Sequence, residues 1–184
     1  MARLQQIPTE QAGEAKPLLE AVQAALGITP NMASVMANSP VALKGWAELN
    51  GTLGKGRLGG KLREQIALTV AEANQCDYCL SAHTAIGAQL GVDAEELEHS
   101  RYGESSDPRT AAALRFAKAV NEGRGEVDDA DVAAVRAAGF DDAEIAEIVA
   151  NVVLNVYTNY FNKVAQTEID FPRISAGVAV RAAA

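Results

Sequence analysis

Apolar residues recur at spacings of three and four along most of this 184-residue chain, and no segment alternates strictly with a period of two. Spacings of three and four place side chains on one face of a helix, whereas alternation is typical of strands. One such stripe runs from Leu18 to Leu26 and stops at Gly27, and another runs from Leu62 to Val70. The chain is therefore expected to be all-α.

Residues that favour the start of a helix stand before several of these apolar stripes. Ser and Asp are good N-caps, and a following proline suits the first helical position. Such signals stand at Ser39, Asp93, Asp107, Asp128 and Asp141. Together with the stripes they predict roughly seven to nine helices joined by short turns.

The last predicted helix, from about residue 142 to 166, is the longest and is apolar in its middle. Apolar residues on more than one face of this helix indicate burial on several sides, in the core or between subunits. We expect one compact helical domain over residues 1–171. Residues 172–184 are expected to form a C-terminal tail that is poorly ordered or is an arm onto a neighbouring subunit.

The charge balance excludes some partners. The formal net charge is −8 and the pI is near 4.8, whereas nucleic acid and anionic membranes require a positive surface. No apolar run approaches a membrane span, and the N-terminus has no signal-peptide stretch. We therefore expect a cytoplasmic protein with no nucleic-acid or membrane partner, in a compartment where thiols are mostly reduced.

The chain has only two cysteines, Cys76 and Cys79, in a C-x-x-C arrangement. A helix over residues 77–90 would place Cys76 at its positive N-terminus, which favours the thiolate. Cys79 and His83 would then share a face. If the preceding helix packs antiparallel, Glu64 comes back toward His83 and can act as its proton partner. The pattern indicates a dithiol redox catalyst.

Three other interpretations of these residues stay open. A structural disulfide would close too small a ring to stabilise the fold much. A metal could be held by Cys76, Cys79, His83 and Glu64, although structural zinc usually takes a second Cys or His pair, which this chain lacks. Both cysteines could also be inert, buried hydrophobes.

The motif of Glu64, eleven residues, Cys76-x-x-Cys79, three residues and His83 resembles the signature of the alkylhydroperoxidase D-like group within the carboxymuconolactone decarboxylase superfamily. The likeness covers most of residues 38–172. It includes the text at residues 63–67 and 79–84 and, more loosely, at 159–162 and 168–172. It implies an all-helical fold and a homo-oligomer, either a trimer or a hexamer. We expect no cofactor and no bound metal.

The resemblance also implies a role for each residue. Cys79 would be the peroxidatic thiol that attacks a hydroperoxide and becomes a sulfenic acid, and Cys76 would be its disulfide partner. Glu64 and His83 would form a proton relay, and a dithiol or thiol-protein would be the reductant. The helix dipole alone favours Cys76, but that effect is only about 0.3–1 kcal/mol, so we side with Cys79.

One departure from the family pattern is Tyr78, which stands where the best-known members carry a second histidine. Tyrosine is no base near neutral pH, given its reference pKa of about 10, but its hydroxyl can donate a hydrogen bond. Two further function classes remain as alternatives. One is a non-catalytic redox sensor, and the other is a carboxymuconolactone decarboxylase-type non-redox enzyme, which has no need of a thiol pair.

Overall fold

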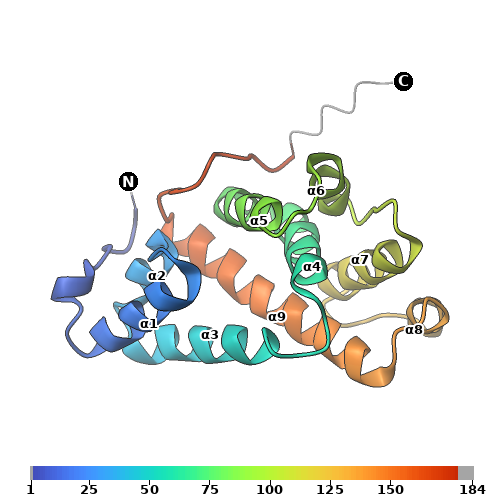
Figure 1. The fold of residues 1–184 in the computed structure, drawn as a ribbon, viewed down its shortest axis with the longest axis horizontal. Coiled ribbons are helices and arrows are strands. Elements are labelled where there is room, and N and C mark those ends of the chain that lie inside the picture. The colour runs from blue at the N-terminus through green and yellow to red at the C-terminus, as the bar shows by residue number, and fades with distance from the viewer. Residues whose placement is uncertain (1, 178–184) are drawn as a thin grey trace.

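The computed structural model describes residues 2–177, and this part of the chain contains helices but no strand (Figure 1). The predicted all-α class is therefore confirmed. Two 3₁₀ turns, Thr9–Gln11 and Gly13–Ala15, precede the α-helices. The α-helices are α1 (Lys16–Leu26), α2 (Asn31–Met36), α3 (Pro40–Leu53), α4 (Gly60–Ala73), α5 (Asp77–Gln89), α6 (Ala94–Arg101), α7 (Pro108–Glu122), α8 (Asp129–Ala137) and α9 (Asp142–Ala165).

The helices begin where the capping residues predicted. The side chains of Ser39 and Asp107 accept hydrogen bonds from backbone N–H groups in the first turns of α3 and α7. Asp128 and Asp141 each form a reciprocal capping box at the start of α8 and α9. Helix α2 was not predicted, because its six residues are too few to show a period.

Helix α4 lies at the centre of the fold and packs against α5, α6, α7 and α9 (Figure 1). It is apolar on opposite sides, so it joins two hydrophobic clusters. Leu68 and Ala71 belong to a cluster shared with α1, α2, α3 and α5. Ile66 and Val70 belong to a second cluster, with α7, α8 and α9. Because both clusters hold α4, Glu64, the one motif residue on this helix, is carried by a helix packed on opposite sides.

After α9 the chain runs back over α5 (Figure 1). We call residues 171–177 the C-terminal strap. Its Arg173 side chain and Ala176 N–H donate to the Asp77 carboxylate, and its Ile174 N–H donates to Ser81 Oγ. The part of the predicted tail that the structure describes therefore lies on its own domain. Residues 178–184 lie outside the described residues, so the predicted arm onto a neighbour stays a prediction.

None of the helices within residues 2–177 has both the length and the apolar character that crossing a membrane would require.

Candidate redox site

A three-residue turn brings the motif together. Helix α4 ends at Ala73 with Asn74 as its C-cap, and Gln75 takes a left-handed conformation with φ of 53°. The Cys76 N–H donates to the Ala71 carbonyl over 2.9 Å. The Asn74 carbonyl also accepts a hydrogen bond from Lys163 Nζ of α9 over 2.8 Å. The turn reverses the chain, so α4 and α5 lie side by side, as the antiparallel packing hypothesis required.

The two cysteines are joined by a disulfide, with their Cα atoms 5.3 Å apart. Cys76 is the N-cap of α5, and its sulfur accepts a hydrogen bond from the Cys79 backbone N–H over 3.3 Å. Each cysteine is only 2% exposed. The sequence thus placed the pair correctly at the start of this helix, within bonding distance of each other.

Glu64 and His83 meet across α4 and α5. The Glu64 carboxylate oxygen lies 2.7 Å from His83 Nδ1, and both side chains are largely buried. A carboxylate can only accept, so Nδ1 carries the hydrogen and Nε2 is the ring nitrogen left to exchange a proton. Gly87 permits the close approach of α6 to α5 beside this pair, because a Cβ there would come within 2.6 Å of the Leu97 side chain.

Two residues from distant parts of the chain contact the Cys79 region. Asn162 Nδ2 on α9 lies 3.5 Å from Cys79 Sγ and 3.2 Å from Met32 Sδ on α2. Asn162 is 4% exposed, and its Oδ1 is buried without a hydrogen-bond partner. The amide therefore presents its donor to sulfur and leaves its acceptor unused.

Tyr78 contacts both α2 near the N-terminus and the chain that follows α9. Its hydroxyl accepts a hydrogen bond from the Met32 backbone N–H over 3.1 Å, and its ring meets the edge of Phe171 at 5.9 Å between centroids. Burial raises the pKa of Tyr78 well above its ordinary value of 10.0, and Asp170 raises this pKa further. Tyr78 is therefore a neutral packing residue at physiological pH.

Replacing Tyr78 by phenylalanine is expected to destabilise the fold by about 1–3 kcal/mol at neutral pH, because the buried Met32 N–H loses its acceptor. Above about pH 10 the unfolded chain releases the tyrosine proton that the folded protein keeps, so the parent loses stability as pH rises. Tyr78→Phe removes that part of the loss. Urea unfolding at neutral and alkaline pH measures both effects.

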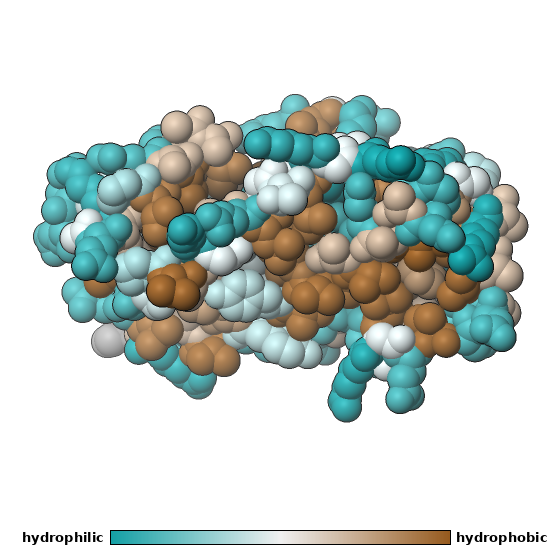
Figure 2. Space-filling view, turned by 90° about the horizontal axis from the view of Figure 1, so that it is seen from below, coloured by the Kyte–Doolittle hydropathy of each residue, from teal (hydrophilic) through white to brown (hydrophobic). Residues whose placement is uncertain are grey.

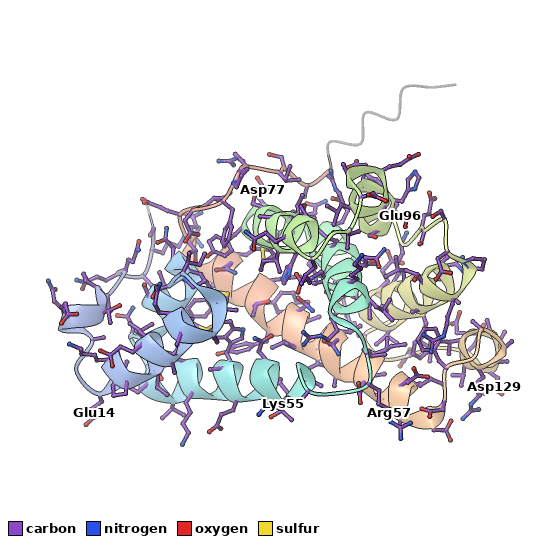
Figure 3. All side chains as sticks on the ribbon, in the orientation of Figure 1. Glu14, Lys55, Arg57, Asp77, Glu96 and Asp129 are labelled. Atoms are coloured by element: carbon purple, nitrogen blue, oxygen red, sulfur yellow. A yellow bond between two sulfur atoms is a disulfide. The ribbon has the colours of Figure 1, made fainter. Side chains whose placement is uncertain are left out.

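A cavity of about 600 Å³ opens beside the disulfide. We call it the redox cavity; it lies between the start of α5, the end of α9 and the chain that follows α9. It is lined by Gln75, Cys76, Asp77, Tyr78, Asn162, Lys163, Gln166, Thr167, Glu168, Ile169, Phe171 and Arg173. Figure 3 shows Asp77 at the start of α5, beneath the chain that passes over this helix. Of the two cysteines, only Cys76 lines the cavity.

The four residues considered as metal ligands are otherwise engaged. The sulfurs of Cys76 and Cys79 bond to one another, and Glu64 bonds to His83. Within residues 2–177, no three or more Cys, His, Asp or Glu side chains gather closely enough to hold a metal ion.

Sequence reasoning did not single out the residues that surround the sulfurs. Met32, Asn162 and Thr167 come from segments far from the motif, and only the text around Asn162 entered the family resemblance. One pattern in the sequence could have indicated Asn162. Asn residues recur at 151, 155, 159 and 162 in an otherwise apolar helix, a spacing that indicates a polar stripe on one buried face.

Residues 40–122 match the model of the carboxymuconolactone decarboxylase family. The fold is similar to that of an uncharacterized peroxidase-related protein from Silicibacter sp. TM1040, with 26% identity, a TM-score of 0.78, and coverage of 91% of this chain and 94% of that one. It is also similar to an uncharacterized peroxidase-related protein from Ralstonia eutropha JMP134, described as an alkylhydroperoxidase core, with 24% identity, a TM-score of 0.82, and coverage of 92% of each chain.

The debrominase Bmp8 shares 19% identity, with a TM-score of 0.79 over 91% of this chain and 92% of that one. At these identities, Bmp8 and the Ralstonia protein show likeness of fold alone. No curated protein matches this sequence.

Proposed function

We propose that this chain is a thiol-dependent peroxidase of the carboxymuconolactone decarboxylase superfamily, because residues 40–122 match the model of that family and the fold is similar to those of two peroxidase-related proteins. The substrate would be a hydroperoxide and the reductant a dithiol or thiol-protein. The cytoplasmic location expected from the sequence suits such a cycle and stays a prediction.

The observation that carries this proposal is the disulfide at the start of α5, one helix turn from a hydrogen-bonded Glu64–His83 pair and beside a cavity. A structural crosslink has no use for a neighbouring proton donor or an access route. A dithiol catalyst requires both, since thiolate is the nucleophile and the leaving alkoxide needs a proton.

In the proposed cycle, the Cys79 thiolate attacks the O–O bond of the hydroperoxide. A Cys79 sulfenic acid forms, and the alkoxide takes a proton from the Glu64–His83 pair and leaves as an alcohol. The Cys76 thiolate then attacks the sulfenic sulfur, so the disulfide forms and hydroxide leaves as water after protonation. A dithiol reduces the disulfide by exchange and is itself oxidised to a disulfide.

Steady-state peroxide consumption with excess dithiol tests the proposal. A peroxidase consumes many equivalents of peroxide per chain. Consumption of a single equivalent, followed by a stable disulfide, would instead favour the redox sensor. No thiol loss on adding peroxide would contradict both and favour the non-redox enzyme.

We further propose that the protein is a homo-oligomer, a trimer or a hexamer, that buries one face of α9. Five exposed apolar side chains share this α9 face: Val149, Val153, Tyr157, Tyr160 and Val164. A hollow of about 280 Å³ lies between part of this face and the end of α7. Figure 2 shows apolar side chains among polar ones on the lower side of the molecule, over α3 and the adjoining part of α9. Contiguous exposed apolar surface indicates an interaction site.

Replacing Val153 by aspartate is expected to weaken self-association at least about tenfold, because a charge would be desolvated in the interface. The fold should survive, since Val153 is 57% exposed. Light scattering coupled to gel filtration measures the mass over a dilution series. Val41→Asp, at a valine of α3 that is 82% exposed, is the matched control. An equal loss of mass in both variants would argue against the α9 face.

A further inference from the structure

We propose that the reducing thiol enters the redox cavity and attacks Sγ of Cys76, and that Asn162 stabilises Cys79 as the departing thiolate. This inference rests on the proposed dithiol cycle and gives the two sulfurs different roles in its reductive half.

Access distinguishes the two sulfurs. Thiol–disulfide exchange requires the incoming thiolate to reach one sulfur and to expel the other. Both cysteines are 2% exposed, but Cys76 lines the redox cavity and Cys79 does not. At about 600 Å³, the cavity has the size of a small-molecule site, so a low-molecular-weight thiol can approach Cys76 through it.

The surroundings of Cys79 suit a leaving group. Asn162 Nδ2 lies 3.5 Å from Cys79 Sγ, and the amide is 4% exposed. Hydrogen bonds to ionised acceptors are stronger than those to neutral ones, so this contact strengthens as Cys79 becomes a thiolate. A leaving thiol with a lower pKa departs faster. Asn162 therefore favours expulsion of Cys79. The helix N-terminus and the Cys79 N–H favour a Cys76 thiolate in the same way, so access through the cavity decides which sulfur is attacked.

Two polar atoms near the redox cavity lack hydrogen-bond partners, which favours the binding of a polar ligand there. Asn162 and Thr167 both line it, and Asn162 Oδ1 and Thr167 Oγ1 are buried without hydrogen-bond partners among the described residues. Buried polar atoms without partners are costly. A ligand in the cavity that supplies a donor and an acceptor would remove this cost, and Cys76 lines the same cavity.

The exchange step balances. A thiolate of the reductant forms an S–S bond with Cys76, the Cys76–Cys79 bond breaks, and its electron pair goes to Cys79. The second thiol of the reductant, as thiolate, then attacks the reductant sulfur of the mixed disulfide and releases the Cys76 thiolate. The reductant leaves as a disulfide, and both protein sulfurs are reduced.

The attacked sulfur can be identified with a monothiol. The oxidised full chain is exposed briefly to 2-mercaptoethanol, the freed thiol is blocked with a maleimide at mildly acidic pH, and the peptide with both cysteines is fragmented in a mass spectrometer. We expect mercaptoethanol on Cys76 and maleimide on Cys79, in an excess of about tenfold or more. An equal or reversed distribution overturns the assignment. The result does not depend on peroxide turnover, so it can fail while the peroxidase proposal stands.

The role of Asn162 is tested in a reduced Cys76→Ser background, where the ultraviolet absorbance of the thiolate reports the pKa of Cys79. Asn162→Ala is expected to raise this pKa by about one unit, and Asn162→Asp by more. In the oxidised parent background, Asn162→Ala should slow reduction by the monothiol about fivefold. An unchanged pKa in both Asn162 variants overturns the role.

Asn155→Ala is the matched control. Asn155 lies two turns earlier on the same buried face of α9 and is 5% exposed, but its Nδ2 donates to the Asn151 carbonyl rather than to sulfur. It should leave the Cys79 pKa unchanged. Circular dichroism checks that each variant is folded, and Asn162→Asp keeps the shape of the parent side chain if Asn162→Ala does not fold.

Discussion

Replacing Cys79 by serine is expected to lower peroxide turnover at least about a thousandfold, because a serine hydroxyl is not ionised near neutral pH and forms no sulfenic acid. Cys76→Ser should behave differently. It keeps the attacking thiol but lacks the partner that closes the disulfide, so the sulfenic acid should accumulate after one equivalent of peroxide. Peroxide loss and trapping with a cyclic diketone measure the two outcomes.

The pair of variants makes the assignment of the cysteines testable. If Cys79→Ser consumed peroxide at the parent rate, Cys79 would not be the peroxidatic thiol. If Cys76→Ser lost all peroxide cleavage while Cys79→Ser retained it, the roles would be reversed. Cys76, as the N-cap that lines the redox cavity, would then be the nucleophile that the helix dipole alone favours.

Replacing His83 by alanine is expected to lower peroxide turnover about a hundredfold, the usual size of a general acid–base contribution. Glu64→Gln should cost less, about tenfold, because glutamine keeps an oxygen that accepts from Nδ1 and so still orients the ring, but it removes the carboxylate from the proposed relay. Steady-state rates with a saturating dithiol measure both.

The chain offers a matched control for His83. His99, the only other histidine, lies on α6 with a side chain 40% exposed, and His99→Ala should retain the parent rate. Added imidazole should restore part of the activity of His83→Ala, because it can take the vacated place and exchange the proton. Equal rates for the two alanine variants would exclude the proposed relay.

The sequence predicted those parts of the site that depend on local geometry. Cys79 and His83 share a face because four residues separate them on a helix. Glu64 reaches His83 because a tight turn makes α4 and α5 antiparallel, the packing on which the prediction depended. The helix starts at Ser39, Asp107, Asp128 and Asp141 were predictable for the same local reason, since each side chain caps its own first turn.

The other parts of the site, around the sulfurs and the redox cavity, depend on contacts between distant segments, which the periodicity of the sequence does not reveal. Asn162 reaches Cys79 across 83 positions and Met32 across 130 positions. Tyr78 stood in the motif at the position of a histidine, but its function in the fold depends on Met32 and Phe171. The residues of the motif do not indicate that the chain after α9 returns over α5 and lines the redox cavity.

Glu64, both cysteines and His83 all lie within residues 40–122, the stretch that matches the family model, whereas Met32, Asn162 and Phe171 lie outside it. The groups proposed to react and most of the residues that line the redox cavity thus lie in separate parts of the chain. Grafting residues 40–122 alone into another helical scaffold would transfer the motif residues without the residues after 122 that line most of the redox cavity. Under the proposed function, selectivity can accordingly be redesigned from the end of α9 and the chain that follows it, while α5 keeps its native sequence.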